Sequence, residues 1–352
     1  MGAAAVYVAP GGLIWGARAR AAAANGAGGL IAGGTTGFTA FEIIERDGAR
    51  LRRRWLSYEA LKATREPALA RHLALIEAPR PAVAGLDFAR PSIMGVINVT
   101  PDSFSDGGLN PDRLSAIAHG RALAAEGADV LDVGGESTRP YAEPLTLGDE
   151  RARVLGVVEA LAGEGHLVSI DTRKPAIMRE AVAAGARIVN DVSALGHDPD
   201  SLATVRDLKV PVVLMHAQGE PETMQIDPRY EDVLLDVYDA LAARIAECEA
   251  AGIARARIIA DPGIGFGKTA GHNLMLLGGL TLLHGLGVPL LVGASRKGFI
   301  GRLTGETVAA RRVPGSLGAA IAIVMQGGQV VRVHDVAATR QALAVWQAAM
   351  GI

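Results

Sequence analysis

The sequence predicts an α/β protein, with a (β/α)8 (TIM) barrel over residues 86–352 and an N-terminal extension over residues 1–85 that packs on it. Three observations favour this architecture. The chain has 352 residues, 49% of them hydrophobic, so it can bury a large core. Eight short apolar runs alternate with helical stretches after residue 92. The charge also changes, from 11 basic and 6 acidic residues before residue 86 to 24 basic and 31 acidic residues after it.

The extension differs in texture from the rest of the chain. It contains an Ala/Gly-rich stretch from Ala21 to Gly34, and four arginines lie within residues 50–54. Prolines at 79, 81 and 91 are typical of a join between folding units. Trp15 and the Phe38–Phe41 segment predict that the extension packs against the barrel, over its base.

The barrel prediction depends on eight candidate strands, each a short apolar run followed by a longer amphipathic stretch. The strands are Ile93–Val99, Val130–Val133, Leu167–Ile170, Ile188–Val189, Val210–Met215, Arg257–Ala260, Pro289–Val292 and Val330–Val333. The predicted helices are Leu114–Glu126, Asp149–Leu161, Ala176–Ala184, Val233–Ala251, Ala309–Met325 and Val336–Ala349. An open, doubly wound parallel sheet is the alternative.

Composition argues against several classes of protein. A formal charge of −2 provides no overall field for a nucleic-acid backbone. The single cysteine, Cys248, allows neither an intrachain disulfide nor a cysteine-based metal cluster. No apolar run approaches the ~18 residues that a membrane span needs. We therefore expect a cytoplasmic protein with no nucleic-acid partner and no membrane anchor.

Polar residues cluster where the predicted strands end. In a parallel barrel these ends meet at one mouth, where the loops that follow the strands build the active site. A single Asp or Asn at such a position is more often a turn former or a helix cap, but the loops that follow are specialised. The residues are Asn98, Asp132, Asp171, Asn190, Asp191, His216, Asp261, Ser295 and His334.

Two of these loops suggest ligands. The loop that begins at Asn98 is rich in Gly, Ser and Asp, and the neutral oxygen of Asn98 suits a hard cation such as Mg2+. In the second loop, Arg139 follows two hydroxyl residues and can hold an anion; a capped turn is the alternative.

The segment from Asp261 to Thr269 looks at first like a nucleotide-binding loop. That motif needs glycine five residues before the glycine of Gly-Lys-Thr, and Pro262 stands there. What remains is a carboxylate, a glycine-rich backbone, the Phe266 ring and the Lys268 ammonium. A carboxylate can accept two parallel hydrogen bonds from a heterocycle with adjacent N–H donors, so this loop predicts a site for a planar ring.

Basic residues follow the last two strands. Arg296 and Lys297 precede a helical stretch, and Arg332 and His334 are two residues apart on a strand, so they point the same way. Barrels often bind phosphate after strands seven and eight. The sequence therefore predicts an anionic, phosphorylated substrate.

Taken together, these motifs resemble dihydropteroate synthase of folate biosynthesis. The resemblance runs from Ser92 to Trp346 and includes Asn98–Phe104, Gly135–Pro140, Ser169–Thr172, Val189–Asp191, Asp261–Lys268, Ser295–Lys297 and Arg332–His334. It implies a TIM barrel that joins 6-hydroxymethyl-7,8-dihydropterin pyrophosphate to p-aminobenzoate. It also implies release of pyrophosphate by an SN1-like route with Mg2+, and a homodimer that is a target of sulfonamides.

Carried over residue by residue, the resemblance assigns four sets of residues. The pterin would be held by Asp171, Asn190, Asp261 and Lys297. The p-aminobenzoate would be held by Thr138, Arg139, Pro140, Phe266, Ser295 and Lys297. Asn98, Arg332 and His334 would hold the pyrophosphate, with Asn98 also on Mg2+. Catalysis would depend on Asp171, Lys297, Arg332 and His334.

Two positions depart from the family pattern. Tyr141 stands where the family commonly has Gly, and Ala217 replaces a common Met, which puts acceptor preference and sulfonamide sensitivity in question. Two alternative functions are a pterin-dependent methyltransferase and a non-catalytic pterin-binding paralogue. The methyltransferase has no pyrophosphate to hold, so the basic residues after the last two strands argue against it.

Overall fold

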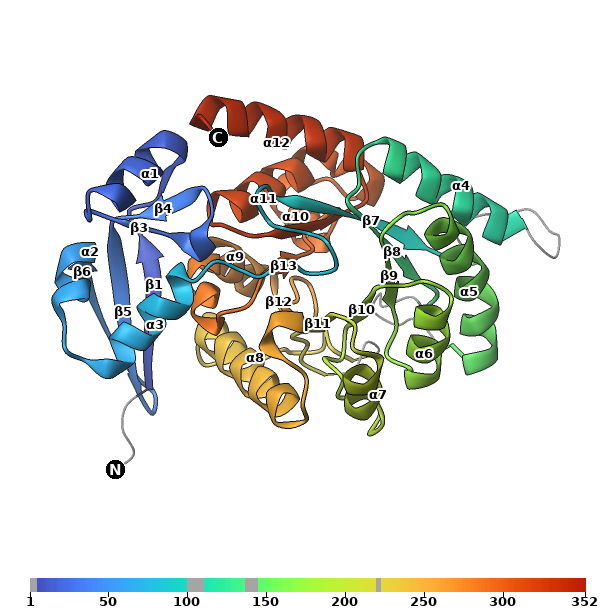
Figure 1. The fold of residues 1–352 in the computed structure, drawn as a ribbon, viewed down its shortest axis with the longest axis horizontal. Helices are drawn as coiled ribbons and strands as arrows, with labels where there is room; N and C mark the ends of the chain where they lie inside the picture. Colours follow the sequence, from blue (N-terminus) through green and yellow to red (C-terminus); the bar gives the residue numbers. More distant parts are fainter. Residues whose placement is uncertain (1–4, 100–110, 137–144, 220–222) are drawn as a thin grey trace.

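The computed structural model describes residues 5–99, 111–136, 145–219 and 223–352, and it contains a parallel eight-stranded barrel (Figure 1). Its order is β12-β11-β10-β9-β8-β7-β14-β13. A parallel bridge between Ala260 and Leu290 joins the two outer strands. The predicted barrel is confirmed, and the open sheet is excluded. The strands are β7 (Ser92–Asn98), β8 (Val130–Gly134), β9 (Val168–Asp171), β10 (Ile188–Asp191), β11 (Val212–Met215), β12 (Ile258–Asp261), β13 (Leu291–Val292) and β14 (Val330–Val333).

Helices surround the barrel, and all six predicted helical stretches contain one. The last turn before α11 differs from the prediction: residues 309–311 form a 3-10 turn, and α11 begins at Val313, where Pro314 occupies the first turn. Two short helices, α7 and α9, were not predicted, and α10 is the helical stretch predicted after Lys297. The helices are α4 (Pro111–Ala125), α5 (Leu147–Gly163), α6 (Pro175–Ala183), α7 (Ser201–Leu208), α8 (Val233–Ala250), α9 (Ala270–Gly278), α10 (Gly298–Thr304), α11 (Val313–Met325) and α12 (Val336–Met350).

The inside of the barrel is filled at its base by one apolar layer. This layer is formed by Met94, Val130, Ile188, Val213, Ile259, Leu291 and Val330, one from each of seven strands. Val83, Leu86 and Phe88 pack against it, so the segment that leads into β7 covers the base of the barrel. Because this layer seals the base, a ligand reaches the interior only from the opposite end, where the strands terminate.

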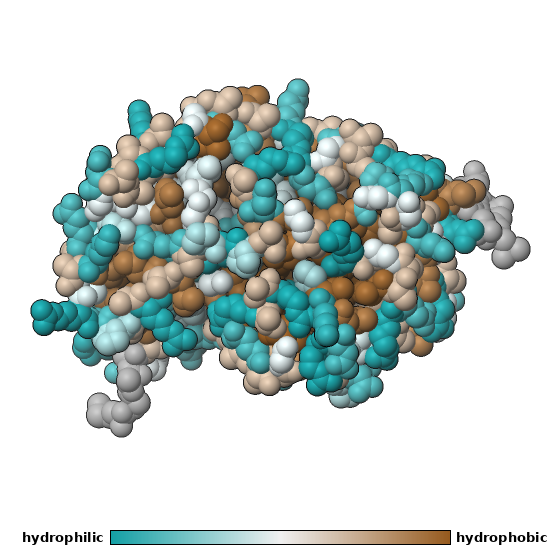
Figure 2. Space-filling view, viewed as in Figure 1, coloured by the Kyte–Doolittle hydropathy of each residue, from teal (hydrophilic) through white to brown (hydrophobic). Residues whose placement is uncertain are grey.

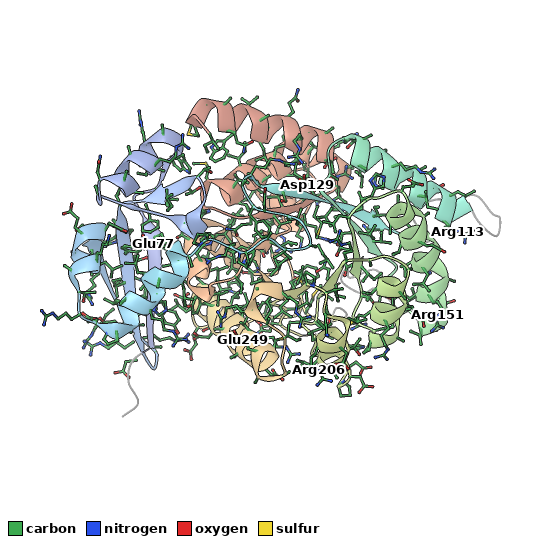
Figure 3. All side chains as sticks on the ribbon, viewed as in Figure 1. Glu77, Arg113, Asp129, Arg151, Arg206 and Glu249 are labelled. Carbon is green, nitrogen blue, oxygen red and sulfur yellow. The ribbon has the colours of Figure 1, made fainter. Side chains whose placement is uncertain are left out.

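Residues 5–78 form an N-terminal unit with its own core. Strands β1 (Ala5–Gly11), β5 (Ala40–Asp47) and β6 (Arg50–Ser57) make one antiparallel sheet, and β2 (Ile14–Trp15), β4 (Thr36–Phe38) and β3 (Gly29–Leu30) make a second. Helices α1 (Gly16–Ala24), α2 (Tyr58–Ala63) and α3 (Pro67–Glu77) complete it. Phe38, Phe41 and Tyr58 pack together in the core, and the Tyr58 hydroxyl donates to Glu77 at 2.7 Å (Figure 3).

This unit lies along the side of the barrel, next to α8 and the ends of α11 and α12 (Figure 1). The Trp15 indole donates to the Met325 carbonyl at 2.9 Å, and the Tyr7 hydroxyl donates to Asp239 of α8 at 2.7 Å. The expected position over the base is therefore wrong, because residues 83–88 already fill that end. Hydrophilic side chains project from the outer edge of the unit, where β6 lies (Figure 2). Among the described residues, no helix is long and apolar enough to cross a membrane.

Candidate active site

The candidate site is the second inward layer of the barrel. Side chains two residues apart on a strand point to the same side, so the residue two places after each member of the apolar layer also faces inward. On β8, β10, β12 and β14 these residues are Asp132, Asn190, Asp261 and Arg332. The strand pattern thus puts three polar or charged groups and a guanidinium directly above an apolar layer.

Arg332 is the centre of this layer. Its Nε donates to Asp132 at 2.6 Å, and its Nη2 donates to Asp171 at 2.8 Å. The Asn190 amide donates to the same Asp132 oxygen at 3.0 Å. Burial raises the pKa of Asp171 to about 7, although the Arg332 charge opposes this shift. Burial alone would lower the pKa of Arg332, but the charges of Asp132 and Asp171 raise it, so the guanidinium stays protonated.

Asp132 is a site residue that sequence analysis placed at a strand end without giving it a role. Its side chain is fully buried, and its Oδ1 has no hydrogen-bond partner among the described residues. A buried acceptor without a donor is costly, so this oxygen is suited to an N–H group of a ligand. The sequence signal was its place, two residues after Val130 on an inward-facing register.

Asp261 ends β12 at the start of the glycine-rich loop. Its Oδ1 accepts the Gly263 N–H at 2.7 Å, and burial raises the pKa of its carboxyl group. A Cβ atom on Gly263, whose φ is +66°, would lie 1.9 Å from the His216 carbonyl oxygen, so only glycine fits this turn. The turn holds the loop against the end of β11 and points the carboxylate inward.

Lys297 follows β13, the strand next to β14, which carries Arg332. Its ammonium group is 4.1 Å from the centre of the Phe266 ring and donates to the Ile264 carbonyl. Burial lowers the pKa of Lys297 to about 7, and the charge of Asp261 opposes this shift. The glycine-rich loop, Phe266 and Lys297 therefore form one wall of the site beside Asp261.

A second buried lysine, Lys268, holds this wall from behind. Its Nζ donates to the carbonyl oxygens of Phe266 at 2.9 Å and His216 at 3.2 Å and lies 3.0 Å from His216 Nδ1. Burial lowers the pKa of Lys268 to about 7 and that of His216 to about 3, so the imidazole is neutral. Sequence analysis named both residues but gave neither this structural task.

His334 and Ser295 lie together at the ends of β14 and β13. The Ser295 hydroxyl oxygen is 3.0 Å from His334 Nδ1 and accepts the His334 N–H at 3.2 Å. Burial, and then the charges of Arg332 and Arg296, lower the pKa of His334 to about 4. A neutral imidazole at this point can donate or accept one hydrogen bond.

Arg296 connects the loop that carries Lys297 to the loop that carries His334. Arg296 adopts a φ of +57°, which is unusual for a residue other than glycine, and its Nε donates to Asp335 at 2.9 Å. Its backbone N–H donates to Ser316 at 2.8 Å. These contacts tie the β13 loop to the β14 loop.

The remaining predicted residues lie at the end of β7 or outside the described residues. Asn98 is the last residue of β7. It pairs with Gly134 of β8, which pairs with Asp171 of β9, so Asn98 lies at the same end of the barrel as Asp171. Thr138, Arg139 and Pro140, with Tyr141, lie outside the described residues. Glu136, just before them, accepts from Arg173 at 2.8 Å and from Lys174 at 2.7 Å.

The donor set at Asn98 fits Mg2+ in one particular way. No group of three His, Cys, Asp or Glu side chains able to hold a metal was found in the described part of the chain. Mg2+ keeps several waters and is commonly held by one or two protein oxygens together with substrate phosphates. The amide oxygen of Asn98 would be the single protein ligand in such a site. This donor is compatible with Mg2+ that is held mainly by water and by a diphosphate.

A barrel whose mouth holds buried carboxylates for a ring and cations for an anion defines a pterin-binding enzyme, and the family described as "Pterin binding enzyme" matches residues 94–334. The dihydropteroate synthase of Neisseria meningitidis serogroup B is 51% identical over 269 residues, which cover 75% of this chain and 94% of that one. The Escherichia coli K12 dihydropteroate synthase is 44% identical over 266 residues, again 75% of this chain and 94% of that one. The chain belongs to the dihydropteroate synthase family, whose members are transferases.

Solved structures agree. Xanthomonas albilineans dihydropteroate synthase with 4-aminobenzoic acid has a TM-score of 0.73 at 49% identity, covering 78% of this chain and 99% of that one. The same enzyme in complex with 7,8-dihydropteroate has a TM-score of 0.71 at 46% identity, covering 78% of this chain and all of that one. The Yersinia pestis enzyme with a sulfonamide drug has a TM-score of 0.73 at 42% identity, covering 77% and 99%.

Proposed function

We propose that this chain condenses 6-hydroxymethyl-7,8-dihydropterin pyrophosphate with p-aminobenzoate, giving 7,8-dihydropteroate and pyrophosphate. The observation that carries the proposal is the Asp132–Arg332–Asp171 cluster at the bottom of the mouth. It combines buried acceptors suited to the N–H edge of a pterin with a cation that balances them. The family relation supplies the reaction.

The pterin ring would lie in the second inward layer. Hydrogen bonds along the edge of the ring would be made by the carboxylates of Asp261 and Asp171, which accept, and by the amide of Asn190, which can donate or accept. The unpartnered Oδ1 of Asp132 adds one more acceptor. Lys297 contacts the ring from above. Bidentate, charge-assisted hydrogen bonds to a carboxylate fix a planar ligand in orientation as well as in affinity, which is what a reaction at its exocyclic methylene requires.

The pyrophosphate would extend toward the rim, where Asn98, Arg332 and His334 hold it. Asn98 would hold Mg2+, which when bound would supply positive charge beside the leaving group. Arg332 also contacts two ring-binding carboxylates, so it links the anion site to the ring site. His334 is held by Ser295 and can donate a hydrogen bond to a phosphate oxygen while remaining neutral.

The reaction would follow an SN1-like course. The bond between the methylene carbon and the pyrophosphate oxygen breaks, and its electron pair leaves with pyrophosphate, whose charge Arg332 and His334 stabilise. The resonance-stabilised pterin cation is favoured by the carboxylates of Asp171 and Asp261. The neutral aryl amine then forms the new C–N bond and loses its proton to water. No protein nucleophile takes part in this sequence.

The p-aminobenzoate would bind against the Phe266 and Lys297 wall, with Ser295 beside it and Thr138, Arg139 and Pro140 from the second loop over it. A sulfonamide drug is bound in the related Yersinia pestis structure. Sulfonamides resemble the second substrate, so we expect them to compete for this wall.

We also propose a cytoplasmic homodimer. Helix α11 carries no charged residue from Val313 to Met325 and packs on α9 and α10. These neighbours expose Leu274, Met275 and Leu303, at 39%, 53% and 59%. A contiguous apolar face of this kind favours a second copy as its partner.

The test is release of pyrophosphate from the pterin substrate with and without p-aminobenzoate and Mg2+. Calorimetry then measures how tightly the unaltered chain and its variants bind the bare pterin and the pterin pyrophosphate, which shows which residues hold the ring and which hold the pyrophosphate. Asp261→Ala is expected to abolish binding of both ligands, whereas His334→Ala should weaken the pyrophosphate form alone. No pyrophosphate release in the presence of both substrates would contradict the proposal and favour a non-catalytic pterin-binding role.

A further inference from the structure

We propose that Arg46 of the N-terminal unit is a positioning residue for the pterin site and acts through the start of α8. The inference rests on the proposed function, because it concerns the wall that would hold the pterin. The family match begins at residue 94, so the unit lies outside the region shared with pterin-binding enzymes. Its contacts nevertheless lead to the active site through hydrogen bonds that are joined by short stretches of backbone.

The series begins at an acidic group of side chains around the start of α8. Arg46 Nη1 donates to Asp236 at 2.7 Å, and Arg46 Nη2 donates to Glu231 at 2.7 Å. Asp239 lies 3.8 Å from Nη1 and accepts the Tyr7 hydroxyl at 2.7 Å. The Arg46 side chain is 18% exposed and that of Asp236 is 23% exposed, so this pair is partly shielded from solvent, whereas Glu231 is 71% exposed.

Asp236, which is held by Arg46, also binds the backbone that precedes α8. Its second oxygen accepts the N–H groups of Glu231 at 2.9 Å and Asp232 at 3.3 Å. Asp232 caps α8 by accepting from Leu234 and Leu235, and Arg53 of the N-terminal unit donates to its other oxygen at 3.2 Å. Arg46 and Arg53 therefore fix the point at which the loop after β11 ends.

That loop supports the glycine-rich loop of the site. The Tyr230 hydroxyl donates to the Gly267 carbonyl at 2.8 Å, and the Gln225 amide donates to the Gly265 carbonyl at 2.7 Å. The packing is close: a Cβ atom on Gly267 would lie 2.2 Å from the Gln218 carbonyl oxygen. A shift of residues 225–230 would therefore move the glycine-rich loop as well.

The glycine-rich loop in turn places the groups that would hold the ring. Its first residue is Asp261, its Phe266 ring lies under the Lys297 ammonium, and a Cβ atom on Gly265 would lie 2.9 Å from Lys297 Cδ. Removing the Arg46 guanidinium leaves Asp236, only 23% exposed, next to Asp232 and Asp239 with no cation of its own. Like-charge repulsion at the start of α8 would loosen this support.

The experiment uses the full-length chain and three variants: Arg46→Met, Arg46→Lys and the control Arg90→Met. Arg90 also pairs with an aspartate, Asp129, which lies just before β8 and outside the N-terminal unit; its side chain is more exposed than that of Arg46, at 54%. Calorimetry with 6-hydroxymethyl-7,8-dihydropterin pyrophosphate gives Kd, and steady-state kinetics separate KM from kcat.

We expect Arg46→Met to raise Kd and the pterin KM by roughly three- to thirty-fold, with a smaller change in kcat, because coupling through such networks is of that order. Arg46→Lys keeps the charge and should recover part of the affinity, while Arg90→Met should leave Kd unchanged. A double variant with Asp236→Asn should lose less than the two single variants combined.

Two results would overturn the inference. The first is a Kd for Arg46→Met equal to that of the unaltered chain, and the second is an equal loss in Arg90→Met, which would indicate general destabilisation. Failure of the unaltered chain to bind the pterin pyrophosphate would instead contradict the proposed function, so the two failures are distinguishable.

Discussion

Arg332 and Asp132 lie 200 residues apart in the chain and form a 2.6 Å ion pair inside the barrel. The carboxylate is fully buried, and the guanidinium also holds Asp171. Because strands β14 and β8 flank β7 in the sheet, both side chains enter the barrel one layer above its apolar base. This pair places a cation between two carboxylates at the mouth of the barrel.

Asp132→Asn should weaken binding of the bare pterin by about ten- to a hundred-fold, because a hydrogen bond to a charged, buried group is lost. The variant keeps the shape of the side chain but removes one of the two carboxylates paired with Arg332, so its thermal midpoint should fall as well. Calorimetry measures the affinity, and the surface carboxylate variant Asp200→Asn is the matched control. Unchanged affinity in Asp132→Asn would mean that its unpartnered oxygen does not face the ligand.

Arg332→Met should lower the free energy of unfolding by about 3–5 kcal/mol, because it leaves two buried carboxylates without their cation. Adding Asp132→Asn to that variant should recover part of the loss, since one of the unpaired charges is then gone. Denaturant unfolding measures both effects. If the double variant is as unstable as the sum of the single variants, the two residues do not interact as the structure indicates.

Binding of the bare pterin should depend on pH near neutrality. The pKa of Asp171 is raised to about 7, so above that pH the carboxylate is ionised and accepts hydrogen bonds, and below it the group takes up a proton. Affinity should therefore fall as the pH is lowered from about 8 to about 6. The Asp171→Asn variant should bind weakly and lose the part of this dependence that Asp171 contributes, while Lys297, whose pKa is lowered to about 7, still titrates. A flat profile for the unaltered chain would contradict this prediction.

Gly263→Ala should abolish pterin binding. Its added Cβ would lie 1.9 Å from the His216 carbonyl oxygen at a φ of +66°, so the turn that points Asp261 inward cannot persist. Gly278→Ala is the control, since nothing lies within 4 Å of its added Cβ. Calorimetry and thermal unfolding of both variants check the expectation, and normal pterin affinity in Gly263→Ala would refute it.

Phe41→Ala should destabilise the N-terminal unit by about 3–5 kcal/mol, because it empties a fully buried aromatic position. Phe41 belongs to the core of the unit, whereas Tyr7 and Ile44 of the same unit pack into the barrel core, so we expect the part around Phe41 to unfold ahead of the barrel. Calorimetric scanning would resolve the two. Leu51→Ala, at a side chain 36% exposed, should change stability by less than about 0.5 kcal/mol.

Sequence analysis predicted the barrel well because its signal is local. Runs such as Ile188–Val189 are uniformly apolar since parallel strands are buried on both faces, and eight of them separated by helices leave few topologies. Short helices such as α7 and α9 were missed because eight or nine residues carry too few turns for a clear periodicity. The position of the extension was wrong because no local pattern tells which exposed face of the barrel a separate core will cover.

The site divides in the same way. That Asp171, Asn190, Asp261 and His334 lie at one mouth follows from the sequence, because the carboxyl ends of parallel strands meet. The pairing of Asp132 with Arg332, the contacts of Lys268 behind the glycine-rich loop and the ion pairs of Arg46 with α8 were decided by the tertiary structure alone. Each of these contacts depends on the register between strands or on segments that are distant in the chain. The local pattern of residues predicts neither the register nor such contacts.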